Sequence, residues 1–231
     1  IRCEVGDFVQ ELLRVWPHDA RITRRPPRPT AEPFEPSGII SRRESGAQRI
    51  SRPILGKVRP SVLMEAIQRG VVEGTDAIVM TEAGNAFAWG SASLRFEEPR
   101  YRVSTGWGSM GQAAAALLGA ALGSGRKAVA ILGDGAMLMQ SEVSTAVQYG
   151  IPAVWIVLND ARYGMIEGGM RMEGLEPRGT AFPQVDFVSF AKSMGAHGER
   201  VSEESELESA IFRAIAHPGP FVLDVVIDPE Q

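Results

Sequence analysis

The sequence predicts an α/β fold in which a parallel sheet carries helices on both faces. From residue 60 onward, short apolar runs alternate with amphipathic or small-residue segments of helical length. The runs are almost continuously apolar, as in strands that are buried on both faces, and glycine-rich polar stretches follow several of them directly. With 231 residues and 44% hydrophobic content, the chain is long enough for one substantial core and is not disordered.

The first sixteen residues contain a small strand and a helix. Residues 1–5 read as a strand, and residues 6–16 read as a helix with Phe8, Leu12, Leu13 and Trp16 on one face. Because two such elements cannot bury themselves, we expect residues 1–16 to be the tail end of a preceding central α/β domain.

Residues 17–59 read as a linker rich in proline and arginine. Prolines at eight positions between 17 and 60 remove backbone donors and prevent long helices. Residues 17–60 hold ten basic and four acidic residues, a net charge of +6, which leaves −10 for the rest of the chain. The segment has almost no aromatic side chains for base stacking, so a solvated linker is favoured over a nucleic-acid tail.

The helices and strands expected in the domain at 60–231 follow from the spacing of its apolar residues and from the residues that end each element. Helices are expected where apolar residues recur at helical spacing or small residues cluster, and strands where short apolar runs occur. The expected helices are 61–71, 111–123, 141–150, 186–195 and 202–217, and the expected strands are 77–80, 127–132, 153–158 and 221–227.

Composition also excludes several classes of protein. No apolar run approaches the length that spans a bilayer, and the first residues lack the layout of a signal peptide. The single cysteine, Cys3, excludes an internal disulfide framework and a multi-cysteine metal site. We therefore expect a cytoplasmic protein that binds neither membrane nor nucleic acid.

Polar residues follow three of the apolar runs, where an open parallel sheet binds its ligands. Gly133-Asp134-Gly135 lies between a strand and a helix, where backbone N–H groups can approach an anion. A phosphate there would repel Asp134 unless a divalent cation lay between them, and Asn159-Asp160 after the next strand offers further oxygen ligands. The pattern favours a diphosphate with Mg²⁺, although Gly-Asp-Gly by itself often makes only a tight turn.

Three segments together resemble a known family. They read TEAGNAFAW (81–89), STGWGSMGQAAAALLGAALG (104–123) and TAVQYGIPAVWIVLND (145–160), with GDG and Asn-Asp separated by 23 residues. In this order they resemble the acetolactate-synthase-like branch of thiamine-diphosphate-dependent enzymes. The resemblance covers about residues 60–228, the diphosphate-binding domain of that family, and so implies the thiamine-diphosphate-binding fold for 60–231.

The resemblance implies a role for each matched residue. Asp134 and Asp160 would bind Mg²⁺ through their side chains and Arg162 through its backbone carbonyl. The family usually has Asn where Asp160 stands, and Asp keeps an oxygen ligand and adds a negative charge. Thiamine diphosphate would be bound by Gly84, Asn85, Ala86, Gly108, Met110, Gly133, Asp134, Gly135, Ala136, Asp160, Tyr163, Gly164 and Met165.

The residues implied for catalysis are Gly108, Met110, Met165 and Ile166. The Gly108 carbonyl would accept a hydrogen bond from the aminopyrimidine, and Met110 would wedge the cofactor into a bent shape that brings its amine to the reactive carbon. Simple decarboxylases of the family commonly have a glutamate where Ile166 stands, although Glu167 is only one residue away. An apolar residue there favours carboligation over aldehyde release.

The glutamate that activates the cofactor in this family has no counterpart in this chain. In the family it belongs to an N-terminal pyrimidine-binding domain, usually of a neighbouring subunit. We therefore expect that domain or a companion chain to complete the site in a homo- or hetero-oligomer, a dimer or a tetramer.

The function expected from the resemblance is decarboxylation of a 2-oxo acid, with pyruvate as the expected donor, and transfer of the acyl anion equivalent to a carbonyl acceptor. Two alternatives remain open: a simple 2-oxo acid decarboxylase that releases an aldehyde, and a non-catalytic cofactor-binding subunit. An oxidase would need FAD in an absent central domain, and nothing in this chain indicates FAD.

Overall fold

A computed structural model describes residues 58–103, 106–139 and 141–228. The elements expected at 1–16, and all of the expected linker except Val58 and Arg59, lie outside these residues. Val58 is buried and bridges to Ile227, and Arg59 pairs with Glu204, so these two residues are attached to the domain.

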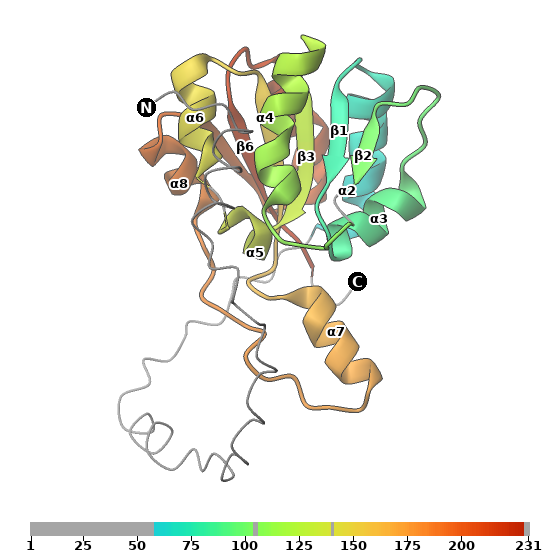
Figure 1. Cartoon of the computed structure of the whole chain (residues 1–231). Coiled ribbons are helices and arrows are strands. Elements are labelled where there is room, and N and C mark those ends of the chain that lie inside the picture. Colours follow the sequence, from blue (N-terminus) through green and yellow to red (C-terminus); the bar gives the residue numbers. More distant parts are fainter. Residues whose placement is uncertain (1–57, 104–105, 140, 229–231) are drawn as a thin grey trace, which may run out of the picture. The chain divides into compact units, whose positions relative to one another are not determined.

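The described residues form a six-stranded sheet whose strand pairs are all parallel (Figure 1). The strand order is β2-β1-β3-β4-β6-β5. The strands are β1 (Ile78–Thr81), β2 (Tyr101–Val103), β3 (Ala128–Gly133), β4 (Ala153–Asn159), β5 (His197–Val201) and β6 (Phe221–Val226). This confirms the parallel sheet, whose continuous apolar strands β3, β4 and β6 are almost entirely buried.

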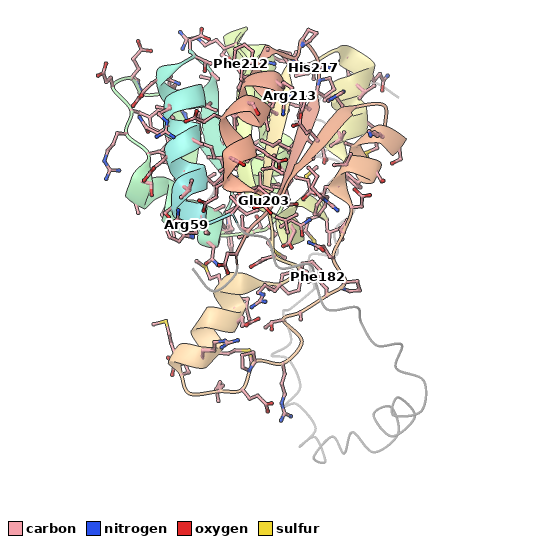
Figure 2. The ribbon with its side chains drawn as sticks, turned by 180° about the vertical axis from the view of Figure 1, so that it is seen from behind. Arg59, Phe182, Glu203, Phe212, Arg213 and His217 are labelled. Carbon is pink, nitrogen blue, oxygen red and sulfur yellow. The ribbon has the colours of Figure 1, made fainter. Side chains whose placement is uncertain are left out.

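Helices cover both faces of the sheet, as the sequence predicts. On one face lie α4 (Gln112–Ser124), α6 (Glu142–Tyr149) and α8 (Phe187–Ser193), which stand in front in Figure 1. The opposite face carries α2 (Pro60–Ile67), its π-helical continuation η1 (Gln68–Glu73), α3 (Asn85–Ser93) and α9 (Leu207–Ala216), after the 3₁₀ turn η2 (Glu204–Glu206). Figure 2 shows α2 and α9 from this side.

The strands β1, β3, β4 and β6 contribute side chains to two separate apolar layers. Along β3, Val129 and Ile131 join the layer under α2 and α9, whereas Ala130 and Leu132 join the layer under α4 and α6. This alternation follows from the two-residue period of a strand.

Two short helices lie at the carboxyl ends of the strands. α5 (Asp134–Met137) begins directly after β3, and α7 (Gly164–Met172) follows β4 after four residues. In Figure 1, α7 projects away from the sheet beyond these strand ends. Among the described residues, no helix is long and apolar enough to cross a membrane.

The sequence pattern missed α3, β2 and β5. The two strands lie at the sheet edges, where exposed residues such as Arg102 and His197 interrupt any apolar run. α3 contains glycine and several small residues and has no clear apolar stripe.

The chain order sets the position of a crevice. From β1 the chain passes outward to β2 and then returns to β3 on the other side of β1. In open parallel sheets, ligands bind beyond the carboxyl ends of the strands at such a reversal. The residues after β1, β3 and β4 are therefore the ones to examine.

Candidate active site

A cavity of about 610 Å³ lies at the carboxyl ends of these strands. Every residue that the sequence predicts to bind the cofactor lines it, together with Arg162 and Ile166. The structure thus brings together segments that are up to 82 residues apart, from Gly84 to Ile166. Pro60, Ala83, Trp89, Leu158, Ile227 and Asp228 also line it, and the sequence pattern singled out none of these for the site.

Asp134 stands at the centre of this edge and is almost completely buried. Its Oδ1 accepts the backbone N–H of Gly135 at 2.7 Å, and its Oδ2 accepts those of Asp160 and Ala161 at 3.2 and 2.6 Å. Ala161 has a positive φ of 58°, which is uncommon for a residue other than glycine. The carboxylate of Asp134 therefore joins the end of β3 to the turn after β4.

The two aspartates both resist ionisation. The pKa of Asp134 is raised to about 7, first because burial disfavours its charged form and second because Asp160 lies nearby. Burial raises the pKa of Asp160 to about 6, although the Arg162 guanidinium opposes the shift. Two neighbouring carboxyl groups with raised pKa values, one buried and one largely buried, form a donor set suited to a hard divalent cation.

The donor set for a metal is limited to two side chains. Within the described ranges, no three His, Cys, Asp or Glu side chains gather in a way that could hold a metal ion. A cation here would rest on Asp134, Asp160 and backbone or cofactor oxygens, as Mg²⁺ bound beside a diphosphate does. The residues present fit that arrangement, and the roles of Asp134, Asp160 and Arg162 as ligands stay predictions.

Two glycines are required by close approach of the loops. A Cβ on Gly135 would lie 2.7 Å from Cε1 of Tyr163, and one on Gly164 would lie 2.8 Å from Nδ2 of Asn85. Both distances are too short for non-bonded atoms. The absence of these side chains lets the segments after β1, β3 and β4 meet.

Met110 lines the cavity close to α5, the helix that begins at Asp134. It is 45% exposed, and its Sδ is 3.7 Å from the place where a Gly135 Cβ would be. Gly108, two residues earlier, has a positive φ of 65°. A large, exposed apolar side chain inside a cavity is available for contact with a ligand, as the wedge role requires.

The structure separates Ile166 from Glu167. Ile166 and Met165 line the cavity, whereas Glu167 does not. Glu167 is 8% exposed; its Oε1 accepts from Arg162 at 3.1 Å and Arg171 at 2.7 Å, and its Oε2 accepts from Thr180 at 3.2 Å. Although burial alone would raise the pKa of Glu167, the bonds from Arg171 and Thr180 and the charge of Arg162 lower it. It is held as a carboxylate away from the cavity.

A buried polar network lies beneath the end of β4, next to Asp160. Asn159 Nδ2 donates to Asp224 Oδ1 at 2.8 Å and to the carbonyl of Val185 at 3.1 Å. Arg200 donates to Asp224 Oδ2 through Nε and Nη2, at 2.9 and 2.6 Å. Sequence reasoning missed this network, and the only signal was a charged residue inside the apolar run of β6.

Comparison with known proteins identifies the family. The family model for the thiamine pyrophosphate enzyme, C-terminal TPP binding domain, matches residues 82–225. The chain belongs to this family of thiamine-diphosphate enzymes. The resemblance predicted from the three sequence segments is thereby confirmed.

Several thiamine-diphosphate enzymes and related proteins are similar to the chain. A Mycobacterium tuberculosis protein with the provisional name acetolactate synthase large subunit IlvB2 is 32% identical over 217 residues, which cover 91% of this chain and 36% of that protein. The 2-hydroxyacyl-CoA lyase of Arabidopsis thaliana is 34% identical, over 68% of this chain and 29% of its own.

A solved structure matches as well. The thiamine diphosphate-dependent 4-hydroxybenzoylformate decarboxylase of Rhodococcus jostii RHA1 superposes with a TM-score of 0.69 and 26% sequence identity, covering 76% of this chain and 33% of that one. This chain therefore spans about a third of the length of the thiamine-diphosphate enzymes that it matches.

Proposed function

We propose that the chain supplies the diphosphate- and metal-binding half of an active site that decarboxylates a 2-oxo acid, with pyruvate as the expected donor, and joins the acyl unit to a carbonyl acceptor. The observation that carries this proposal is that one cavity is lined by the buried Asp134 and the largely buried Asp160 together with Met110, Gly84 and Asn85. Thiamine diphosphate, when bound, supplies the carbon centre that accepts the electrons left by CO₂.

Within this proposal the chain's own residues bind and orient. Asp134 and Asp160 would hold Mg²⁺, and the backbone at Gly135 and Ala136, with Gly84 and Asn85 opposite, would hold the diphosphate. Met110 would constrain the cofactor from the side that faces Gly135. The largely apolar lining from Met110, Met165, Ile166 and Trp89 would exclude water from the reacting carbon.

The choice between carboligation and aldehyde release depends on whether a proton donor faces the reacting carbon. Ile166 has no ionisable group that could donate a proton, and Glu167 is ionised and bound to Arg162 and Arg171 outside the cavity. Among the cavity-lining positions of α7, none is acidic. This arrangement supports transfer to a second carbonyl compound.

A simple decarboxylase is the second candidate, and similarity to the Rhodococcus decarboxylase favours it. Activity of either kind requires the remaining two thirds of a typical relative, as an N-terminal portion or a companion chain in an oligomer. The two candidates differ in product: a hydroxyketone from carboligation, an aldehyde from simple decarboxylation.

Calorimetric titration with thiamine diphosphate tests the cofactor assignment. The chain should bind it saturably with Mg²⁺ present and lose that binding in EDTA. Absence of binding in both conditions, with the N-terminal portion or companion present, would overturn the proposal. Product analysis of the completed enzyme with pyruvate and an aldehyde then decides between carboligation and decarboxylation.

A further inference from the structure

Helix α4 begins without a cap of its own. Its N-cap residue is Gly111, which has no side chain and no capping hydrogen bond, and whose φ is 92°. The first N–H groups of a helix have no partner within the helix and need acceptors from elsewhere when they are buried. Ala113 and Ala114, in this first turn, are both fully buried.

Glu82 provides the missing acceptor from a different part of the fold. It follows β1 directly and is itself fully buried. Its Oε2 accepts the backbone N–H of Ala113 at 3.0 Å and that of Ala114 at 3.2 Å. A carboxylate at this position also interacts favourably with the positive end of the helix dipole.

The carboxylate joins two segments that line the cavity. On the β1 side, Gly84 and Asn85 follow Glu82 within three residues, and on the α4 side, Gly108 and Met110 come directly before the helix. Trp155 of β4 adds a second attachment, because its Nε1 donates to the carbonyl of Ala114 at 2.8 Å. The start of α4 is thus held against both β1 and β4.

The other oxygen of Glu82 has no hydrogen-bond partner. Oε1 is buried and unpaired among the residues that the structure describes. Burying a carboxylate with one oxygen unsatisfied is unfavourable, and an apolar side chain would avoid this cost. The clamp on Ala113 and Ala114 is the feature that a carboxylate adds at this position.

We propose that Glu82 is a positioning residue for the cofactor: it fixes the Gly108–Gly111 segment, and with it Met110, relative to Gly84 and Asn85. The metal side of the cavity, at Asp134 and Asp160, does not depend on this clamp, since none of its contacts involves Glu82. Cofactor affinity and affinity for Mg²⁺ alone should therefore respond differently to loss of Glu82. The inference rests on the proposed function, because it presumes that thiamine diphosphate binds here.

The test compares Glu82→Ala and Glu82→Gln with Asp186→Ala in the full chain. Asp186 is a matched control because it caps another helix, α8, through the N–H groups of Val188 and Ser189, at 3.1 Å each, and does not line the cavity. Loss of either cap should lower the melting temperature. Only loss of Glu82 should loosen the cavity wall.

Glu82→Ala should raise the Kd for thiamine diphosphate at saturating Mg²⁺ by about tenfold, because only a part of the stability that two hydrogen bonds to a charged group contribute is lost from cofactor binding and the rest is lost from folding. Glu82→Gln, which keeps one acceptor oxygen, should raise it about threefold. The Kd for Mg²⁺ alone should stay within about twofold in both Glu82 variants, and Asp186→Ala should leave the Kd for thiamine diphosphate at saturating Mg²⁺ within that range. In the ligand-free chain, hydrogen exchange at residues 106–114 should speed up in Glu82→Ala and not in Asp186→Ala.

Several outcomes would overturn the inference. An unchanged Kd for thiamine diphosphate in Glu82→Ala would do so. So would an equal loss of affinity for thiamine diphosphate and for Mg²⁺ alone in that variant, or a loss of affinity for thiamine diphosphate in Asp186→Ala as large as in Glu82→Ala. If Glu82→Ala does not fold, the decision falls to Glu82→Gln, whose cofactor Kd must then rise. If the unsubstituted chain binds no thiamine diphosphate when its N-terminal portion or companion chain is present, the proposed function fails. Unchanged hydrogen exchange at residues 106–114 in the Glu82 variants refutes the clamp independently of cofactor binding.

Discussion

The side chain of Asp134 accepts the backbone N–H of Asp160 at 3.2 Å, so the two acidic residues that directly follow the neighbouring strands β3 and β4 are joined by a hydrogen bond. The same oxygen accepts the N–H of Ala161. A carboxylate that already accepts three N–H groups is fixed in orientation before any ligand arrives, which reduces the ordering that metal binding requires.

Replacement of Asp134 by Asn should abolish the magnesium dependence of cofactor binding. An amide keeps a neutral oxygen but removes the charge and one of the two carboxylate oxygens. Because even indirect supports of a metal ligand are worth about 10- to 100-fold in affinity, loss of this ligand should weaken Mg²⁺ binding by more than about 100-fold. Calorimetric titration with Mg²⁺ measures this loss of affinity.

Glu208→Gln is the control, because Glu208 is an exposed carboxylate paired with Arg69, and it should leave Mg²⁺ binding unchanged. Retained affinity in Asp134→Asn would remove Asp134 from the ligand set.

Magnesium binding should weaken as the pH falls from 8 to 6. With pKa values of about 7 and 6, Asp134 and Asp160 are both ionised at pH 8, but at pH 6 a cation must displace a proton from most Asp134 and from half of Asp160. The affinity for Mg²⁺ should then fall by about 20-fold between these pH values. Titrations in buffers of different ionisation enthalpy should also detect released protons near pH 6.5.

The same pKa values predict an opposite trend for the stability of the metal-free chain. Both are raised above the ordinary 3.8, so their contribution to the free energy of unfolding is fully present below pH 3.8 and is lost as the pH rises through about 6 to 7. Mg²⁺ should offset that loss at pH 8. Equal Mg²⁺ affinity at pH 6 and 8 would contradict the raised pKa values of both Asp134 and Asp160.

Much of this site could be predicted because its residues follow strands directly. Asp134 and Asp160 are recognisable in the sequence, since the carboxyl ends of parallel strands meet at one edge. The capping of α4 by Glu82 was not predictable, because 31 residues separate Glu82 from Ala113 and no periodic pattern relates them. The bond between Asn159 and Asp224 spans 65 residues and was missed for the same reason.

The orientation of Glu167 illustrates a different limit of sequence reasoning. Its neighbour Ile166 lines the cavity, and on a helix a one-residue change of register turns a side chain by about 100°. Only the positions of Arg162, Arg171 and Thr180 decide which of the two faces the cavity. The sequence alone left that choice open.

Ile166→Glu should change the product in the completed enzyme. A carboxylic acid facing the cavity could donate a proton to the reacting carbon, and positioned proton transfer is worth about 10²- to 10⁴-fold in rate. Aldehyde should then exceed hydroxyketone when pyruvate and an acceptor are supplied together, as chromatography of the products would show. Ile166→Leu, which adds no proton donor, should keep the original product ratio. A hydroxyketone ratio unaffected by Ile166→Glu would argue against this control of the reaction.

Gly135→Ala should destabilise the chain through its contact with Tyr163. The added Cβ would lie 2.7 Å from the tyrosine ring, and such overpacking costs about 1–3 kcal/mol. Gly133→Ala is the matched control, because a Cβ there meets nothing within 4 Å and the backbone φ is −76°. Chemical denaturation measures both. The pair Gly135→Ala with Tyr163→Ala should recover most of the loss caused by Gly135→Ala, and additive losses would show that the contact is not its cause.

Loss of Asp224 should weaken Mg²⁺ binding, although Asp224 is not one of the predicted ligands. Burial raises the pKa of Asp224 although Asn159 and Arg200 donate hydrogen bonds to it, so the charged form depends on these partners. Asp224→Ala removes the buried acceptor of Arg200, whose side chain is 32% exposed and stays 3.5 Å from Asp186, and leaving buried donors without an acceptor costs about 1–3 kcal/mol. It also leaves Asn159, next to Asp160, without one of its two anchors. The Kd for Mg²⁺ should therefore rise about 10-fold, as for the loss of other indirect supports. Arg213→Ala removes the more exposed pair with Glu199, which lies on the opposite face of the edge strand β5. It should lower stability by less than about 1 kcal/mol and leave Mg²⁺ binding unchanged. If Asp224→Ala lowers the melting temperature but not the affinity for Mg²⁺, the network supports the sheet alone, and the orientation of Asp160 is set by Asp134 and the turn at Ala161.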